Sequence, residues 1–394
     1  MYNFTFYAPT KVIFGKKTED QVGEIVKSYG FHKVLVHYGT ASVKRSGLLD
    51  KVLSLLDENS IAHVELGGVV PNPRLSLVYQ GIELAKKEKV DLILAVGGGS
   101  VIDSAKAIGY GVSNPGDVWD FYMGKRKPEA CLPVGVILTL AATGSEMSDS
   151  SVITNENGAL KHGCSSNLSR PLFAIMNPEL TMTLPDYQTS CGCTDIIMHT
   201  LERWFTQGGN MELTDAIATA VIQTVMEQAR ILHKDPKCYD ARAEVMWAGS
   251  LSHNDLTGCG ANCRGDWAVH GMEHEIGGLF DVAHGAGLAA IWGSWARYVL
   301  DSDLPRFVKL ATKVLGIKPQ KTEKETALKG IEAMESFFHE IGMPTCISEL
   351  GIKPTEEDLK TMARKCIEAG GGKKGCAKVL YKPDVLKIYQ MADK

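Results

Sequence analysis

The chain changes character near Leu184, and this change constrains its fold more than any other feature of the sequence. From Lys33 to about Met176, short apolar runs rich in β-branched residues alternate with segments of helical period. Alternation of this kind is typical of βαβ units, in which helices cover both faces of a parallel sheet. Beyond Leu184 the apolar residues recur with helical period only. We therefore expect an α/β domain over residues 1–184 and an all-helical domain over residues 185–394.

Three apolar runs in the first part predict buried strands over residues 33–38, 91–96 and 133–139. Each is apolar at consecutive positions, as a strand of a parallel sheet requires when both of its faces are covered. Amphipathic stretches over residues 48–56 and 78–87 predict helices between these strands.

In the second part, two patterns of period 3.6 predict helices over residues 307–315 and 327–341. Gly316 and Gly342 follow these patterns and act as helix stops.

The composition places few constraints on function. The formal net charge is −4 and the basic residues are scattered, so we expect neither nucleic acid nor a membrane surface as a partner. No apolar run is long enough to cross a bilayer, and the N-terminus lacks the basic and apolar regions of a secretory signal, which indicates a cytoplasmic protein. Because the cytoplasm is reducing, we expect all ten cysteines to be free thiols.

Two loops after predicted strands suit a dinucleotide. A glycine run follows the strand over residues 91–96 and starts a helix-compatible segment, where glycines allow close approach of a diphosphate and free N–H groups attract its charge. This run departs from the G-x-G-x-x-G fingerprint and is equally typical of a tight connection. A second loop, rich in hydroxyl groups, follows the strand over residues 133–139, and ligands of open α/β sheets bind at such carboxyl ends. The candidate cofactor-binding residues are Gly97, Gly98, Gly99, Ser100, Asp103, Thr139 and Thr143.

A third loop bears on the choice of cofactor. An NAD-selective site places an acid on the adenosine ribose, whereas this chain offers Gly39 and Ser42, with Lys44 and Arg45 nearby. These residues would tolerate a 2′-phosphate and favour NADP(H) over NAD(H). The alternative is that Lys44 and Arg45 merely start a solvated helix.

Two clusters of candidate metal ligands lie in the helical part. Asp195 and His199 are spaced i, i+4 and therefore share one face of a helix. His270 and His274 have the same spacing, and His284 stands where a new apolar helix begins. Carboxylate and imidazole together suit Fe(II), Zn(II) or a related divalent ion. Each pair alone is common by chance, and a lone histidine on an apolar helix is usually a core residue. The nucleotide signature elsewhere in the chain favours the joint interpretation.

The order of these motifs resembles the iron-containing (group III) alcohol dehydrogenases, with the butanol dehydrogenase subgroup as the nearest match. The resemblance covers almost the whole chain. It rests on Pro-Thr-Lys-Val-Ile-Phe-Gly at 9–15, Pro-Asn-Pro at 71–73, the glycine run at 97–103, Ala-Thr-Gly-Ser-Glu at 142–146, Asp195-x3-His199 and His270-x3-His274-x9-His284. Two departures, Ala141 and the pair Thr40-Ala41, put the cofactor preference in doubt.

The resemblance implies a dehydroquinate synthase-like architecture and a metal held by Asp195, His199, His270 and His284, with His274 nearby but not a ligand. It also implies a dinucleotide across the loops of Gly97–Ser100 and Thr139–Thr143, and commonly a homodimer. The reaction would transfer hydride between nicotinamide and short-chain primary alcohols or aldehydes such as butanol and butyraldehyde. Fe(II), with Zn(II) as the alternative, would act as a Lewis acid. His274 is the candidate proton relay, or else a residue that only orients a ligand.

Two other functions compete with this one. His270-x-x-Glu273-His274 matches the H-x-x-E-H motif of zinc hydrolases, in which two histidines bind zinc and the glutamate is the general base. That motif leaves Asp195, His199 and the glycine run unexplained. A catalytically silent dinucleotide-binding sensor is the second alternative, and loss of metal ligands would support it.

Overall fold

The computed structural model describes residues 1–207 and 209–394, which divide into two compact units. One unit comprises Ala8–Thr183, and the other comprises Leu184–Lys394 together with Met1–Tyr7. The boundary at Leu184 lies where the hydrophobic pattern of the sequence changes. The first seven residues group with the helical unit, although the sequence analysis assigned them to the α/β domain.

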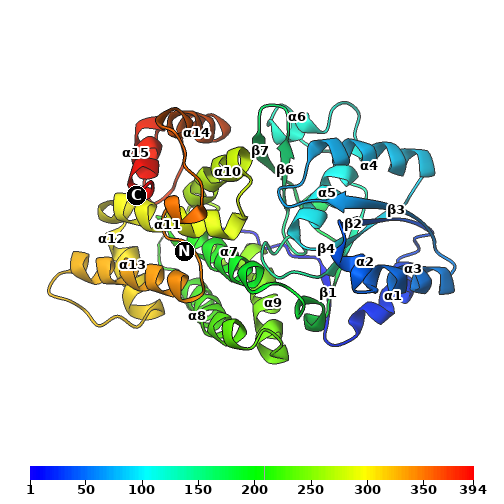
Figure 1. Ribbon diagram of the computed structural model, residues 1–394, viewed down its shortest axis with the longest axis horizontal. Coiled ribbons are helices and arrows are strands. Elements are labelled where there is room, and N and C mark those ends of the chain that lie inside the picture. The colour runs from blue at the N-terminus through cyan, green and yellow to red at the C-terminus, as the bar shows by residue number, and fades with distance from the viewer. Residues whose placement is uncertain (208) are drawn as a thin grey trace. The chain divides into compact units, whose positions relative to one another are not determined.

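A sheet of six parallel strands forms the centre of the unit Ala8–Thr183 (Figure 1). The three strands predicted from apolar runs are its middle strands, because those are covered on both faces. The shorter or half-exposed strands carry a weaker signal. In sheet order the strands are β1 (Lys11–Phe14), β8 (Phe173–Met176), β5 (Val134–Leu138), β4 (Leu92–Gly97), β2 (Lys33–Gly39) and β3 (Ala62–Val69).

Alternate residues of each strand face opposite layers of helices. Val34 and Val36 of β2 join a buried cluster with Val52 and Leu56 of α3. His37, one residue on, points to the other face and contacts Ser104 of α5. The first face is covered by α1 (Val22–Ser28), α2 (Ser42–Arg45) and α3 (Leu48–Glu58), and the second by α4 (Leu75–Glu88) and α5 (Gly99–Ser113).

An antiparallel hairpin follows the parallel strands, and the sequence analysis did not predict it. It pairs β6 (Ser150–Asn155) with β7 (Leu160–Ser165). Its turn contains Gly158 and Ala159 at positive φ. The unit also contains α6 (Trp119–Tyr122) and the short 3-10 helices η1 (Thr18–Gln21), η2 (Asn167–Ser169) and η3 (Pro178–Thr181).

The second unit is helical, and its described part contains no strand. The predicted helix over residues 307–315 is divided into α12 (Leu304–Lys309) and a π-helical turn, η6 (Leu310–Val314), and ends before Gly316 at positive φ. The remaining helices are α7 (Asp186–Trp204), α8 (Glu212–Lys234), α9 (Tyr239–His253), α10 (Ala268–Phe280), α11 (His284–Val299), α13 (Glu323–Glu340), α14 (Glu356–Ala369) and α15 (Lys382–Ala392), with 3-10 turns η4 (Leu256–Gly258), η5 (Leu300–Ser302) and η7 (Ser348–Leu350). Among the described residues, no helix combines the length and the apolar character needed to cross a bilayer.

One prediction about the cysteines was wrong. Cys263 and Cys376 form a disulfide, whereas the other eight cysteines are free thiols. The partners are 113 residues apart in sequence, so no spacing motif announces the pair. The fold brings them together because the Asp266 carboxylate accepts hydrogen bonds from the N–H groups of Cys376 and Ala377, which holds the two loops side by side.

Candidate metal centre and cofactor loops

Two of the candidate metal ligands lie on one face of helix α7. Pro185 precedes its first turn, and nearly every residue from Thr189 to Trp204 is buried. Asp195 and His199, one turn apart, are 2% and 4% exposed. A carboxylate and an imidazole are thus held in the interior of the helical unit, where burial of a polar group is costly unless it has a partner.

Helices α10 and α11 bring two further imidazoles to this face. His270 lies in the first turn of α10, and His284 is the first residue of α11. The next residue, Gly285, lies against the backbone of α7, because a Cβ there would come 2.1 Å from the carbonyl oxygen of Cys191. Only glycine allows α11 to approach α7 so closely, and this approach carries His284 to the Asp195 carboxylate.

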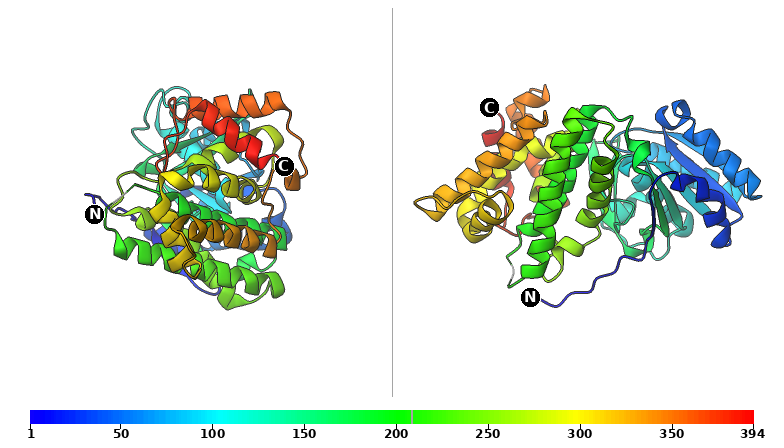
Figure 2. Two further views of the ribbon diagram at one scale, coloured as in Figure 1. Left: turned by 90° about the vertical axis from the view of Figure 1, so that its left-hand side faces the viewer. Right: turned by 90° about the horizontal axis from the view of Figure 1, so that it is seen from below.

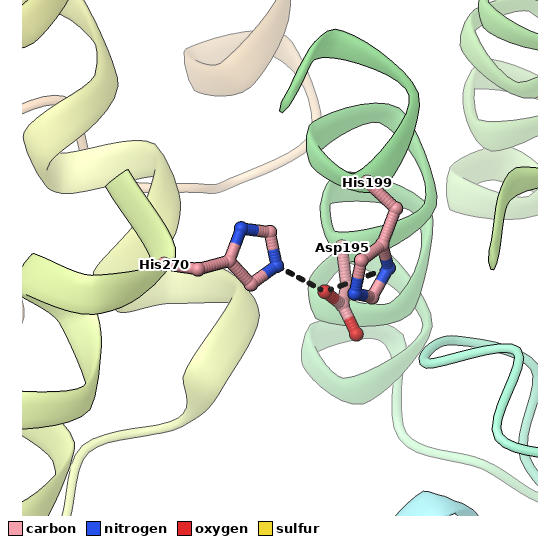
Figure 3. A group of neighbouring side chains, drawn as sticks. All are labelled: Asp195, His199 and His270. Atoms are coloured by element: carbon pink, nitrogen blue, oxygen red, sulfur yellow. Dashed lines mark ion pairs between the residues drawn. The ribbon is translucent and has the colours of Figure 1, made fainter. Parts of the chain in front are cut away.

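The three imidazoles converge on one oxygen atom of the Asp195 carboxylate. The Asp195 Oδ1 atom lies 3.4 Å from His199 Nδ1 and 3.6 Å from both His270 Nε2 and His284 Nε2. Figure 3 shows His270 reaching from its own helix toward Asp195 and His199 on α7. The structure therefore brings together all four residues that the sequence analysis named as ligands.

The polar atoms of this cluster fit a divalent cation. Within the described chain, Asp195 Oδ1, His199 Nδ1 and His270 Nε2 are buried and have no hydrogen-bond partner. Buried polar atoms in proteins nearly always have a hydrogen-bond partner. Three neighbouring buried atoms without one are therefore suited to binding an ion. Ligand atoms of Asp195, His199 and His270 all lie within 4.8 Å of one another. One carboxylate with imidazoles is a ligand set that Fe(II) and Zn(II) accept.

Burial and neighbouring charges shift two of these imidazoles in opposite directions. Burial, together with the nearby His253 and His270 rings, lowers the pKa of His199 well below 6.5. Burial also lowers the pKa of His270, but the carboxylates of Asp195 and Glu202 outweigh it and raise that pKa to about 9. Metal ions bind the neutral imidazole, so a bound cation has to displace the proton that these carboxylates attract to His270.

Two buried glutamates behind the ligands were not singled out for this role. The backbone N–H and Nδ1 of His270 both lie 2.9 Å from Glu202 Oε1, and His284 Nδ1 contacts Glu273 Oε2. Glu202 follows Asp195 by seven residues and His199 by three, so the helical period already places it on the ligand face. From the sequence, Glu273 was a candidate only for the general base of a hydrolase.

Aromatic rings enclose the other side of His199. The His253 ring packs edge-on against it with ring centroids 4.0 Å apart, and the Trp267 ring lies 5.3 Å from the His270 ring. His274 is further out, with its ring 5.9 Å from that of His284. A ligand atom of His274 lies within 4.8 Å of ligand atoms of Glu273 and His284.

The three candidate cofactor loops follow adjacent strands of the sheet. Tyr38 of β2 pairs with Val96 of β4, and Gly97 of β4 pairs with Leu138 of β5, so Gly39, Gly98 and Thr139 continue from neighbouring strand ends. The chain leaves β2 for β3 on one side and returns to β4 on the other. The loops therefore lie at a switch point of the strand order, where open α/β sheets bind ligands.

The loops after β4 and β5 pack closely against each other, which explains why glycine is needed at part of the run. A Cβ at Gly99 would come 2.3 Å from the Thr143 hydroxyl oxygen. The Thr139 N–H also donates to the Gly97 carbonyl. The glycines thus serve a tight connection, and Gly99 and Ser100 also start α5, whose N-terminus attracts anions.

Asp103 and Lys106 of α5 hold the second loop. The Asp103 carboxylate accepts hydrogen bonds from the Ser145 hydroxyl at 2.6 Å and the Val152 N–H at 2.9 Å. The fully buried Lys106 ammonium donates to the carbonyls of Ser145, Ser148 and Ser150 at 2.7, 2.9 and 2.8 Å. In the described structure Asp103 therefore contacts protein groups, and Lys106 is a residue that the sequence analysis missed.

The third loop has a short helix. Gly39 is the last residue of β2, and Ser42 is the first residue of α2. The Lys44 ammonium lies 5.1 Å from the Tyr38 ring centroid. Lys44 and Arg45 thus belong to α2 and are exposed, which is the arrangement of the alternative interpretation.

Two family models match almost the whole chain. Residues 9–178 match the model for "Iron-containing alcohol dehydrogenase", and residues 189–392 match the C-terminal model of the Fe-containing alcohol dehydrogenase family. The NADH-dependent butanol dehydrogenase A of Clostridium acetobutylicum is 39% identical over 99% of this chain and 99% of that protein. The NADPH-dependent aldehyde reductase YqhD of Escherichia coli is 32% identical over 89% of this chain and 90% of that protein. The crystal structure of NADH-dependent butanol dehydrogenase A from Thermotoga maritima superimposes with a TM-score of 0.96 and 39% identity, and the match covers 100% of this chain and 99% of that one.

Proposed function

We propose, from the premise that this chain belongs to the iron-containing alcohol dehydrogenase family, that its substrates are short-chain primary alcohols and aldehydes such as butanol and butyraldehyde. The chain is an NAD(P)H-linked alcohol dehydrogenase. The convergence of three imidazoles on Asp195 Oδ1 is the observation that carries the metal-dependent reaction. The hydrolase and sensor alternatives find no support among the relatives.

The ligand set proposed for the cation is Asp195, His199, His270 and His284, with Fe(II) preferred and Zn(II) as the alternative. When bound, the cation supplies a Lewis acid that stabilises negative charge on the substrate oxygen. The buried Asp195 carboxylate offsets part of the cation's charge, and the surrounding imidazoles are neutral donors. Asp195, His199 and His270 are buried, which limits competition by water for the ligand atoms.

His274 is the proposed proton relay. Its imidazole is half-buried and close to His284, so it borders the ligand cluster without being one of the four ligands. Alcohol oxidation releases a proton, and an imidazole is the side chain suited to pass it on near neutral pH.

The proposed dinucleotide site comprises the three adjacent loops, with Gly97, Gly98, Gly99, Ser100, Thr139 and Thr143 in contact with the cofactor and Gly39 and Ser42 near the adenosine ribose. Asp103 contributes by holding the loop that carries Ser145. Because no acid stands at Gly39 or Ser42, we propose that the site accepts NADP(H) and favours it over NAD(H).

A homodimer is the proposed assembly. Tyr2, Phe4, Phe6 and Tyr7 are about half exposed on an extended N-terminal segment (Figure 2). Exposed aromatic residues in such number mark an interaction surface. Light scattering should give twice the mass of one chain, and a variant lacking residues 2–7 should give a smaller value.

The decisive experiment measures metal content and cofactor oxidation together. Protein purified without oxygen should contain one Fe(II) or Zn(II) per chain and oxidise NADPH or NADH when butyraldehyde is added. His270→Ala should lose both the metal and the activity, whereas His233→Ala, which changes a more exposed histidine of the same unit, should retain both. A wild-type protein that oxidises neither cofactor with any aldehyde would refute the proposed substrates.

His274→Ala separates the relay from the ligands. This variant should keep its metal and lose turnover in alcohol oxidation. The loss should be greatest at low pH, where little free hydroxide is available to take the proton in place of His274. Turnover with the wild-type pH profile would exclude the relay.

A further inference from the structure

We infer that Glu202 and Glu273 are positioning residues of the metal centre, each of which fixes the orientation and tautomer of one ligand imidazole. The inference rests on the proposed ligand set and extends it to two side chains that touch neither substrate nor cofactor. It assigns Glu202 to His270 and Glu273 to His284.

Glu202 holds His270 at two points. Its Oε1 atom accepts hydrogen bonds from the backbone N–H and from Nδ1–H of His270, both at 2.9 Å. His270 is the third residue of α10, where backbone N–H groups have no partner within the helix. Glu202 therefore caps α10 from α7 and orients the imidazole with the same oxygen atom. The backbone contact fixes where the side chain starts, and the ring contact fixes how it is turned.

Glu273 has the equivalent contact with the second imidazole. Its Oε2 atom accepts from His284 Nδ1, and its side chain is fully buried. A Cβ at Gly287 would come 2.8 Å from Glu273 Cγ, which shows that the carboxylate is packed tightly against α11. The His284 side chain is a quarter exposed, so this contact helps to restrain a ring at the edge of the cluster.

The two contacts select the same tautomer. A proton on Nδ1 leaves the lone pair on Nε2, and the Nε2 atoms of His270 and His284 are the atoms that face Asp195 Oδ1 at 3.6 Å. A carboxylate that accepts from the far ring nitrogen also makes the imidazole a stronger donor to a cation. Both rings are therefore oriented with Nε2 toward the same position before the ion arrives.

The test compares metal affinity in isosteric variants. Glu202→Gln and Glu273→Gln keep the side-chain shape and remove the charge, and each should weaken Zn²⁺ binding about 10- to 100-fold in competition with a chromophoric chelator. Since each glutamate serves a different imidazole, the double variant should bind Zn²⁺ more weakly than either single variant. Glu275→Gln is the matched control, because Glu275 is also buried on α10 but lies near Cys366 and Tyr389.

A second measurement needs no substitution. In Zn²⁺-loaded wild-type protein labelled with ¹⁵N-histidine, nuclear magnetic resonance should find the proton of His270 and of His284 on Nδ1. Protons on Nε2, or Gln variants with wild-type Zn²⁺ affinity, would overturn the inference. A protein that binds Zn²⁺ as described but reduces no aldehyde would instead contradict the proposed function and leave the positioning role intact.

Discussion

Buried histidines in this chain differ in whether their surroundings favour the charged or the neutral form of the side chain. His37 lies in the middle of β2 and is completely buried, with Nδ1 2.8 Å from the Leu66 carbonyl oxygen and Nε2 2.9 Å from the Ser104 hydroxyl. Burial lowers its pKa from 6.5 to about 4, although the hydrogen bond to Leu66 works in the opposite direction. His37 is therefore a neutral structural residue, in contrast to the histidines of the metal centre.

This shift predicts a pH-dependent loss of stability. Between pH 6.5 and about 4 the unfolded chain binds a proton at His37 that the folded chain does not, so the free energy of unfolding decreases as the pH falls. The slope from this residue is about 1.4 kcal/mol per pH unit, for a total of about 3 kcal/mol. In urea unfolding, His37→Asn should remove this slope, whereas His32→Asn, at an exposed position, should retain it. Parallel pH profiles for wild type and His37→Asn would refute the assignment.

At this scale, local spacing predicted the four candidate ligands because i, i+4 pairs and helix starts are visible in a short window. Glu202 lies on the same face of α7 as Asp195 and His199, yet the histidine that it orients is 68 residues away. No local pattern links the two, so the sequence pointed to the four candidate ligands but not to Glu202.

Among the secondary-structure elements, α5 combines two tasks. Its first residues form the glycine turn, and its second turn holds the loop that follows β5 through Asp103 and Lys106. Lysine in a helix is ordinarily a solvent-exposed residue, so no sequence pattern distinguishes Lys106 from the other lysines. Its acceptors come from a loop about forty residues later, whose shape became known only with the fold. The hairpin of β6 and β7 was missed for a related reason, since its strands are short and partly polar.

We expect Lys106→Met to destabilise the unit Ala8–Thr183. The substitution removes the donor to three carbonyl groups of the loop and should cost about 3 kcal/mol, because carbonyl oxygens left without partners are expensive to bury. Urea unfolding would measure the loss, with Lys86→Met, at an exposed position of α4, as the control. If both variants unfolded at the same urea concentration, Lys106 would not hold the loop.

For the whole molecule, the hydrophobic pattern of the sequence changes near Leu184, and the two compact units of the structure meet in the chain at the same point. Periodicity predicted the parallel sheet and the helical second unit because both depend on repeated apolar positions. It could not predict that Met1–Tyr7 belongs with residues near Gly260, where the Tyr2 N–H donates to the Gly260 carbonyl. Such pairings of distant segments, like the disulfide, are properties of the folded chain.

Removal of the metal should destabilise only the helical unit of the chain. All four proposed ligands lie in Leu184–Lys394, so a chelator should increase amide exchange in α7, α10 and α11 and leave the central strands β2, β4 and β5 unchanged. At a free metal concentration 100 times the dissociation constant, binding stabilises the folded state by about 2.7 kcal/mol. Exchange that increased equally throughout the chain would argue against a cation confined to this cluster.

Because the candidate metal ligands and the candidate cofactor loops are built from separate stretches of sequence, we expect the choice of ion and the choice of coenzyme to be independent of each other in this enzyme. Substitutions between residues 39 and 45 should alter the proposed preference for a 2′-phosphate without touching a candidate ligand of the ion, and exchange of Fe(II) for Zn(II) should leave the candidate cofactor loops as they are. Engineering or natural selection can therefore change one requirement at a time.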